Sequence, residues 1–233
     1  MKQSWSIIIF AYNEENSIGR VIDKSVEVLK KISGEIFELI IVNDGSTDST
    51  FREIQNRAKK NSKIIVINHE KNLGIGQSQM SGYNMAHYEN VCAIPGDGQF
   101  NPNELTPYSN FPDKTIVSFY RIEKTRYTVF RKLLSWANRV LNHKLLGIKL
   151  RDVNWVKVYK RSFFDSIKPV LTSALVESEI CAKMLKKGYT VIEVPSKYHP
   201  RTGGKSKGAS LKTIVKVLVE ISKLYLILKC RKK

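Results

Sequence analysis

Cysteine and long apolar runs are both scarce in this chain. The cysteines are odd in number and show no metal-ligand spacing: they are Cys92, Cys181 and Cys230. We therefore expect a reducing, cytosolic setting without a structural disulfide. No apolar run reaches the length of a membrane-spanning helix, and the first residues lack the layout of a signal peptide. These absences argue against a disulfide-stapled secreted domain and against an integral membrane protein.

Acidic residues are scarce in the second half of the chain. The formal net charge is +18. Residues 1–113 hold 11 Lys and Arg against 14 Asp and Glu, a net charge of −3, whereas residues 114–233 hold 28 against 7, a net charge of +21. A positive field of that size attracts polyanions such as nucleic acid, anionic lipid headgroups or phosphorylated substrates. Charge alone does not choose among these partners.

The first hundred residues have no internal repeat and instead alternate strands with helices. The apolar patterns predict strands over residues 6–10, 37–43, 63–68 and 90–94, separated by helices over residues 16–32, 48–60 and 77–89. This order predicts an α/β fold with a parallel sheet that helices cover on both faces. At 233 residues the chain is long enough for one such domain with a tail.

The alternation loosens after residue 103. We expect strands over 115–120, 152–159 and 189–194, and helices over 127–146 and 176–187. A glycine-rich basic segment follows at 198–208, and residues 209–233 are predicted to form a basic amphipathic helix. Such a helix can lie on an anionic membrane, or it can dock into a groove of the same protein or of a second subunit.

Three acidic side chains follow the ends of predicted strands: Glu14, Asp44 and Asp97. The carboxyl ends of parallel strands meet at one edge of a sheet, where open α/β sheets bind their ligands. We therefore expect the three carboxylates to converge on one pocket. The alternative for Asp44 and Asp97 is a purely local role in a turn, since each precedes a glycine.

The order of motifs resembles the family 2 glycosyltransferases, which have the nucleotide-sugar-binding glycosyltransferase A-type α/β fold. The matching segments are AYNEE at 11–15, VNDGSTD at 42–48, NLGIG at 72–76, PGDGQF at 95–100, RDVN at 151–154 and EVPSKYHPRTGGKS at 193–206. The chain looks most like the dolichyl- and polyprenyl-phosphate sugar transferases of that family. The resemblance implies a catalytic domain over residues 1–208, with a nucleotide-binding half at 1–113 and an acceptor-binding half at 114–208, before the C-terminal helix at 209–233.

The resemblance also implies roles for single residues. Those expected to bind the donor nucleotide are Ala11, Tyr12, Glu14, Asp44, Gly74 and Asp97. A divalent cation, Mg²⁺ or Mn²⁺, is expected on Asp97 and Gln99. Pro95 stands where the family motif has its first acidic residue, so the cation would take more of its oxygen ligands from substrate phosphates and bind less tightly. Asn43 and Gln79 also depart from the family pattern, in place of a frequent aspartate and arginine.

Sugar transfer from a nucleotide diphosphate needs charge compensation on the departing diphosphate and a nucleophile on the opposite face of the sugar. The predicted catalytic residues are Asp97, Asp152 and Arg201. The side chains expected to hold phosphate groups are Arg121, Arg126, Arg131, Lys132, Arg201, Lys205 and Ser206. A phosphate acceptor is already ionised, whereas a hydroxyl acceptor needs a general base, for which Asp152 is the first candidate and Glu179 the second. A single displacement predicts inversion at the anomeric carbon.

Structural roles remain open for several of these residues. Asp152 can simply pair with Arg151, Glu179 can be an exposed helix charge, and the basic residues between 121 and 132 can form a solvated face. The four histidines show no partner spacing, and we interpret them as structural or surface residues. Trp136 and Trp155 are expected in the core.

We therefore expect an inverting, metal-assisted glycosyltransferase, peripheral on the cytosolic face of a membrane. Its substrates would be a UDP- or GDP-sugar and a polyprenyl phosphate, and its partners an anionic membrane surface and a membrane subunit or second copy, without nucleic acid. One alternative is transfer to a saccharide or other hydroxyl acceptor. Another is an inactive transferase-like or nucleic-acid-binding protein, which the missing acid at Pro95 favours.

Overall fold

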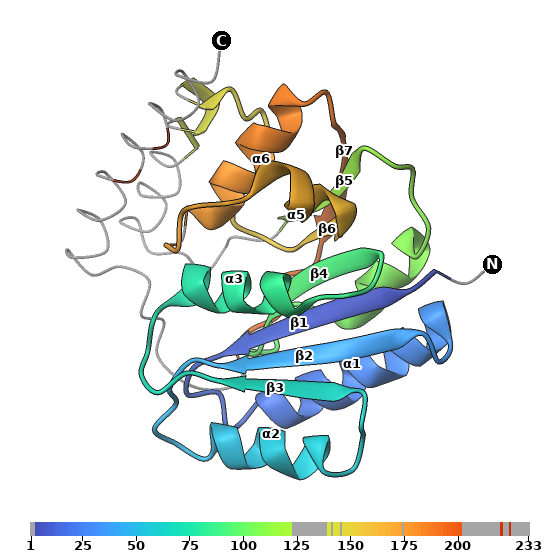
Figure 1. Cartoon of the computed structure of the whole chain (residues 1–233), viewed down its shortest axis with the longest axis vertical. Coiled ribbons are helices and arrows are strands. Elements are labelled where there is room, and N and C mark those ends of the chain that lie inside the picture. The colour runs from blue at the N-terminus through green and yellow to red at the C-terminus, as the bar shows by residue number, and fades with distance from the viewer. Residues whose placement is uncertain are drawn as a thin grey trace.

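The strands of the protein form one mixed sheet (Figure 1). The computed structural model describes residues 3–122, 139–140, 142–144, 146–173, 175–201, 220 and 224. The sheet has seven strands in the order β3-β2-β1-β4-β6-β5-β7. The strands are β1 (Trp5–Ala11), β2 (Phe37–Asn43), β3 (Ile64–Asn68), β4 (Asn90–Pro95), β5 (Thr115–Arg121), β6 (Lys157–Lys160) and β7 (Thr190–Ser196).

Most neighbouring strands are parallel, as the alternating pattern predicts. β1 pairs in parallel with β2 and β4, β2 with β3, and β5 with β7. Among the described strands only β6 runs against its neighbours, β4 and β5. The α/β fold with a mostly parallel sheet is therefore confirmed.

The predicted strand at 152–159 is wrong in its first part, because β6 begins only at Lys157. The Lys157 side chain is buried, and its ammonium group donates to the backbone carbonyls of Val153 and Trp155. These carbonyls are bound by a side chain instead of a neighbouring strand, so the chain turns here before the strand starts.

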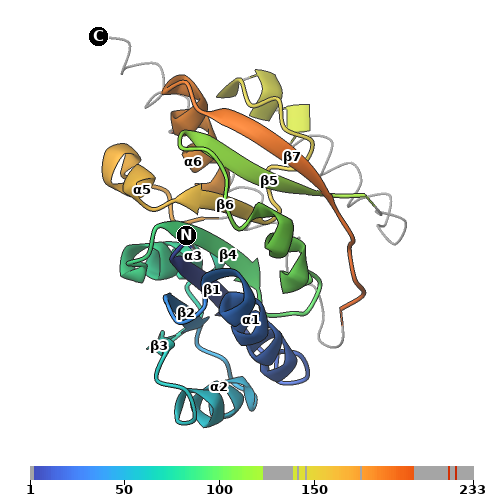
Figure 2. The same cartoon turned by 90° about the vertical axis from the view of Figure 1, so that its right-hand side faces the viewer.

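Helices lie on both faces of the sheet, as Figure 2 shows edge-on. They are α1 (Ile18–Ser33), α2 (Thr50–Ala58), α3 (Ile75–Met85), the 3-10 helix η1 (Pro102–Tyr108), α5 (Ser162–Ile167) and α6 (Val176–Lys186). The short η1 and α5 were not predicted, since segments of 7 and 6 residues carry little periodicity. The Asp48 carboxylate accepts a hydrogen bond from the Thr50 backbone N at the start of α2 (2.9 Å).

Alternate residues of the strands supply two separate cores. In β1, Ile7 and Ile9 pack with α1, α2 and η1, whereas Ile8 packs with α3, α5 and α6. All three are fully buried. The side-chain period of 2 thus places successive apolar residues on opposite faces, so a near-continuous apolar strand is the pattern expected of a sheet covered on both sides.

Two predicted helices lie largely outside the described residues: 127–146 and the C-terminal helix at 209–233. Within the latter the structure describes Glu220 and Leu224. The Leu224 side chain is fully buried in a third apolar cluster with Ile148, Leu150 and Leu175. At this position an apolar side chain of the segment therefore packs against the protein itself.

Candidate active site

The carboxyl ends of β1, β2 and β4 lie side by side because these strands are parallel neighbours (Figure 1). Backbone hydrogen bonds continue beyond the strands. The Asp44 N–H donates to the Ala11 carbonyl over 2.9 Å, and the Gly96 N–H donates to the Phe10 carbonyl over 3.0 Å. The loops that carry the predicted acidic residues therefore start from one edge of the sheet.

Glu14, Asp97 and Arg201 come together at this edge. Glu14 is 6% exposed and forms an ion pair with Arg201, 187 residues further along the chain. Asp97 lies close enough to interact electrostatically with both Glu14 and Arg201. Two carboxylates from the first half of the chain thus face one guanidinium from the second half. Arg201 was predicted to bind phosphate, but its pairing with Glu14 was not.

Burial raises the pKa of both carboxyls, Glu14 above 4.5 and Asp97 above 3.8. Arg201 opposes the rise at both residues, and for Asp97 a hydrogen bond from the Gln99 backbone N also opposes it. A raised pKa means that the charged form is disfavoured in the fold, so ionisation above that pKa costs folding stability. A cation bound beside these carboxylates would offset that cost, which is typical of ligand sites.

The predicted cation position holds one carboxylate from the protein. Gln99 donates from its backbone N to Asp97 Oδ1 over 3.0 Å, and its side-chain amide N donates to the Tyr198 hydroxyl. Pro95, two residues before Asp97, offers no side-chain oxygen. Within the described ranges, no group of three or more His, Cys, Asp or Glu side chains has the arrangement of a metal site.

Arg121 and Asp152, which the sequence suggested as separate phosphate-binding and base residues, are paired with each other. Arg121 Nε lies 2.7 Å from Asp152 Oδ2, and Nη2 lies 2.9 Å from Oδ1. The guanidinium also stacks over the rings of Trp155, at 4.8 Å from the centroid, and Tyr198, at 5.7 Å. Both oxygens of Asp152 therefore accept from a cation, an arrangement that suits a fixed ion pair better than a general base.

The alternative in which Asp152 pairs with its neighbour Arg151 is not the pairing found in the structure, where Asp152 pairs with Arg121. The Arg151 backbone N donates to Glu193 Oε1 over 2.8 Å, and its guanidinium donates to the Tyr120 hydroxyl over 2.8 Å. Arg151 and Asp152 therefore have different partners.

Glu179 is not an exposed charge, and its hydrogen-bond and ion-pair partners within the described part of the chain do not include the other predicted site residues. Its side chain is fully buried and accepts from the backbone N–H groups of Val170 (3.0 Å) and Leu171 (2.7 Å). Lys183 pairs with it from the next turn of α6. Glu179 therefore anchors the segment before α6, and we withdraw it as a candidate base.

Asp44 is held by three donors from the protein. Its Oδ1 accepts from the Leu73 backbone N over 2.9 Å, and its Oδ2 accepts from the Gly74 backbone N over 2.8 Å. His69 Nδ1 lies 2.8 Å from Oδ1. Asp44 and Gly74, each predicted to bind the donor nucleotide, are thus in direct contact. His69 is a residue that sequence reasoning missed, because the 25 residues between it and Asp44 carry no spacing signal.

Some of the remaining predicted residues lie in the part of the chain that the structure describes, and others lie outside it. Ala11 is buried at the end of β1, and Tyr12 beside it is half-buried. Trp155 is buried in the core, as predicted, although it also stacks on Arg121. The predicted residues outside the described part of the chain are Arg126, Arg131, Lys132, Lys205 and Ser206, together with Trp136.

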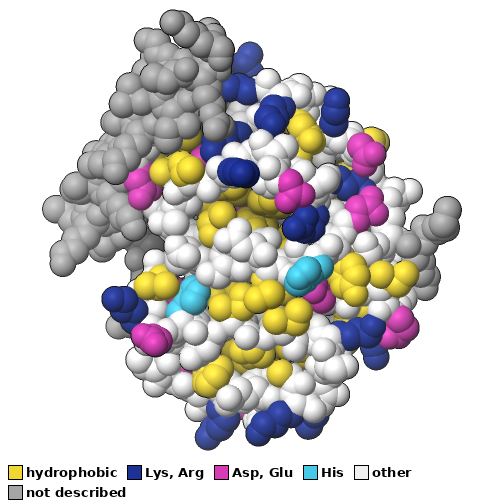
Figure 3. All heavy atoms as spheres, in the orientation of Figure 1, with side chains coloured by type: hydrophobic (Ala, Val, Ile, Leu, Met, Phe, Trp, Pro, Cys, Tyr) yellow, Lys and Arg dark blue, Asp and Glu magenta, His cyan; other side chains and the backbone are white. Residues whose placement is uncertain are grey.

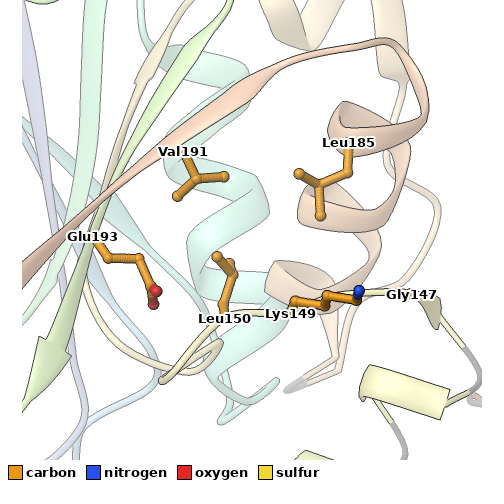
Figure 4. Close-up of a pocket in the computed structure, with 6 residues that line it drawn as sticks. All are labelled: Gly147, Lys149, Leu150, Leu185, Val191 and Glu193. Carbon is orange, nitrogen blue, oxygen red and sulfur yellow. The ribbon is translucent and has the colours of Figure 1, made fainter.

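A separate cavity of about 340 Å³ lies between β7, α6 and residues 147–150 (Figure 4). The aliphatic side chains of Leu150, Leu185 and Val191 line it. Lys149 and Glu193 complete its wall together with Gly147. Because Glu193 also accepts from the Arg151 backbone N, the cavity adjoins the segment that carries Asp152.

Lysine and arginine side chains are frequent on the half of the surface that carries α5 and α6 (Figure 3). On the face shown they are interspersed with acidic side chains. Among the residues that the structure describes, no helix combines the length and the apolarity that a membrane span requires.

The fold is similar to that of solved glycosyltransferases. Glucosyl-3-phosphoglycerate synthase from Mycobacterium tuberculosis, in complex with Mn²⁺, UDP and phosphoglyceric acid, superposes with a TM-score of 0.72 at 18% sequence identity. The match covers 97% of this chain and 78% of that one. It supports the glycosyltransferase A-type fold that the motifs imply.

Sequence comparison finds relatives that are named for transfer to dolichyl or undecaprenyl phosphate. Dolichyl-phosphate beta-glucosyltransferase of Trichomonas vaginalis is 26% identical over 237 residues, covering 93% of this chain and 72% of that protein. Undecaprenyl-phosphate 4-deoxy-4-formamido-L-arabinose transferase of Proteus mirabilis is 27% identical over 169 residues, covering 70% of this chain. The chain spans only 50% of the length of that second relative.

The family model described as Glycosyl transferase family 2 matches residues 6–167. That range contains β1 apart from its first residue and all of β2 to β6, with Glu14, Asp44, Asp97 and the Arg121–Asp152 pair. With the fold, the strand-end carboxylates and more than half of the sequence in agreement, the chain belongs to glycosyl transferase family 2.

Proposed function

We propose that this glycosyltransferase moves a sugar from a nucleotide diphosphate donor to a polyprenyl phosphate, with inversion at the anomeric carbon. The observation that carries the proposal is the meeting of Glu14, Asp97 and Arg201 at the carboxyl edge of the sheet. Two carboxylates and a guanidinium suit a metal-associated diphosphate, since the carboxylates favour cations and the guanidinium favours phosphate oxygens. The relatives named for dolichyl and undecaprenyl phosphate support the acceptor class.

We infer that residues 1–113 bind the donor and residues 114–208 the acceptor. Asp97 and the amide oxygen of Gln99 would hold Mg²⁺ or Mn²⁺, with most further ligands coming from the donor diphosphate. The half-buried Asp97, whose pKa is raised by burial, fits such a cation, and the similar Mycobacterium tuberculosis structure contains Mn²⁺ and UDP. When bound, the cation would supply charge compensation for the departing diphosphate.

Arg201 would add to that compensation from the protein. Its charge is matched by Glu14 in the structure. A diphosphate that carries more negative charge than one carboxylate would compete for the same guanidinium. The expected phosphate ligands Lys205 and Ser206 follow Arg201 closely in the sequence and would join it.

The pairing of Asp152 with Arg121 supports a phosphate acceptor over a hydroxyl one. A phosphate oxygen is already ionised and attacks without a general base. The engagement of both Asp152 oxygens by Arg121 is therefore compatible with a phosphate acceptor. Arg126 and Arg131 remain our proposed ligands for the acceptor phosphate. The aliphatic cavity of Leu150, Leu185 and Val191, beside the Asp152 segment, would take the first isoprene units of the lipid.

We further propose that the protein works at the cytosolic face of a membrane, where a polyprenyl phosphate presents its headgroup. The charge of +21 on residues 114–233 would attract an anionic membrane surface. The basic C-terminal segment at 209–233, or a membrane subunit or second copy, would strengthen that attachment.

The test is a transfer assay with a panel of UDP- and GDP-sugars, Mn²⁺ or Mg²⁺, and a short polyprenyl phosphate. We expect release of nucleotide diphosphate that depends on the lipid phosphate. If turnover occurs only with a hydroxyl acceptor, the acceptor is a hydroxyl compound and not a polyprenyl phosphate. Absence of turnover with every donor, together with salt-dependent retention of DNA or RNA, would instead favour a non-enzymatic role.

A further inference from the structure

The end of the edge strand β3 contacts the end of β2 through polar groups. Asn43 Nδ2 donates to Asn68 Oδ1 over 2.6 Å, and the His69 backbone N donates to the Asn43 carbonyl over 2.9 Å. The His69 ring then reaches Asp44. In β3 itself Ile64 is buried, and Ile65, Val66 and Ile67 are partly buried against the two cores. Beyond this packing, the end of the strand contributes the polar contact with Asn43, and the residue after it contributes the contact with Asp44.

Both ring nitrogens of His69 have partners. Nδ1 lies 2.8 Å from Asp44 Oδ1, and Nε2 lies 3.0 Å from the hydroxyl oxygen of Ser81 on α3. The side chains of His69 and Asp44 are 9% and 5% exposed. An imidazole can donate from Nδ1 to a carboxylate while Nε2 shares a hydrogen bond with a hydroxyl, so one ring orientation serves both partners. His69 therefore bridges the end of β2 to α3 and restricts rotation of the Asp44 carboxylate.

His69 is the only one of the three described donors to Asp44 that is a side chain. The other two are the backbone N–H groups of Leu73 and Gly74, which stand in the turn before α3. A hydrogen bond to a charged group is among the stronger ones in proteins. Without the ring, Oδ1 keeps one donor and the carboxylate gains freedom to turn away from Leu73. The orientation of Asp44 and the placement of the turn thus depend on His69.

We propose that His69 is a positioning residue of the donor-nucleotide site, which holds Asp44 and the Leu73–Gly74 turn in place for the nucleoside of the donor. The inference rests on the proposed function, in which residues 1–113 bind the donor, and on the donor-nucleotide role that the family resemblance implies for Asp44. A fixed carboxylate binds a ligand without first losing rotational freedom, so the effect falls on donor affinity. The chemical step at the sugar lies elsewhere, at Asp97 and Arg201.

The two ring contacts can be separated with two amides of different length. In His69→Asn the amide N stands near the place of Nδ1 and can still donate to Asp44. In His69→Gln the amide stands near the place of Nε2, which retains a partner for Ser81 and loses the contact with Asp44. His69→Ala removes both contacts, and Ser81→Ala removes only the contact between His69 Nε2 and the Ser81 hydroxyl.

The experiment is calorimetric titration of each variant with UDP and with GDP, each in Mn²⁺, alongside thermal unfolding and the donor KM and kcat. We expect His69→Ala and His69→Gln to weaken nucleotide binding and raise the donor KM about tenfold, the loss expected for one hydrogen bond to a charged group. His69→Asn should stay within about threefold of the wild type by the same reasoning, and kcat at saturating donor should change little in all three.

The contrast between Asn and Gln separates positioning from a general structural role. If His69→Ala is folded and binds nucleotide as tightly as the wild type, this inference is overturned and the proposed function is not. So would equal weakening by Asn and Gln, because the contact with Asp44 would then not be the one that matters. A wild type that binds neither nucleotide would overturn the proposed function and this inference together.

Discussion

The two halves of the molecule place their functional side chains in different ways. In residues 3–113 the acidic side chains follow strand ends, and Asp44 takes its supporting backbone contacts from the Leu73–Gly74 turn of the same half. In residues 114–201 the charged side chains pair across long stretches of chain, as Arg121 does with Asp152 and Arg201 with Glu14. The first half thus builds its part of the site by local rules, and the second half builds it by tertiary pairing.

Buried polar groups join the two halves. Glu177 on α6 accepts from the hydroxyls of Tyr159 (2.6 Å) and Tyr83 on α3 (2.8 Å). Gln79, also on α3, donates to it over 3.3 Å, and the Lys157 ammonium lies 3.4 Å away. Buried polar clusters of this kind are stable when every group is satisfied and costly when one is removed. The comparison therefore predicts that substitutions in the second half damage folding more readily than those at the strand ends of the first.

The largest expected effect is on activity, at a strand end of the first half. Asp97→Asn should reduce sugar transfer by about 10²-fold or more, since it removes a charge that holds the cation on the diphosphate. The same variant should melt at a higher temperature than the wild type at neutral pH. Burial raises the pKa of Asp97, so its ionisation costs stability above that pKa, and asparagine does not ionise.

The assay is steady-state transfer together with thermal unfolding. The matched control is Asp113→Asn, whose side chain is 91% exposed and should change neither quantity. A melting temperature that falls in Asp97→Asn would show that this carboxylate serves folding, and would remove the contrast between the two halves.

The second effect is on stability, in the second half. Asp152→Ala leaves the guanidinium of Arg121 without its carboxylate in a site where the side chains are 14% and 6% exposed. We expect a loss of about 3 kcal/mol or more in the free energy of unfolding, the usual result of breaking a buried pair. Arg151→Ala should cost at most about 1 kcal/mol, because that side chain is 66% exposed. Urea unfolding of the two variants measures the difference, and equal losses would contradict the assigned pairing.

The same contrast explains what the sequence could predict. The α/β fold and the convergence of Glu14 and Asp97 follow from short segments in which a buried strand runs into an acidic loop, so local patterns were sufficient. The partners of Asp152 and Glu14 could not be found in this way, since 31 and 187 residues separate them from Arg121 and Arg201. Only the strand order brings these residues together.

The third effect concerns the acceptor. Leu185→Glu places a charge in the wall of the aliphatic cavity and should reduce transfer to a long polyprenyl phosphate by about tenfold, which corresponds to the loss of roughly two buried methylene groups. Transfer to a short, water-soluble analogue should be unchanged. Ile36→Glu is the matched control, since this isoleucine is already 51% exposed just before β2. A loss of the same size with both acceptors would remove the cavity from the lipid path.

The smallest effect is on the pH dependence of donor binding. The pKa of Asp97 and that of Glu14 lie above their ordinary values of 3.8 and 4.5, and both carboxyls must be ionised to favour a cation. Affinity for a metal–nucleotide complex should therefore fall on acidification, and it should begin to fall at a higher pH than ordinary carboxyls would give. Titration of Mn²⁺ with nucleotide at successively lower pH tests this. An affinity that stays constant until the protein unfolds would contradict it.

The most direct test of the account is calorimetric binding of UDP and GDP, with and without Mn²⁺, to the wild type, Asp97→Asn and Arg201→Ala. The meeting of Glu14, Asp97 and Arg201 predicts that the wild type binds one of the nucleotides in a metal-dependent way. Asp97→Asn should lose the metal dependence, and Arg201→Ala should bind more weakly while keeping it. Nucleotide binding that both substitutions leave unchanged would contradict the site proposed at this edge of the sheet.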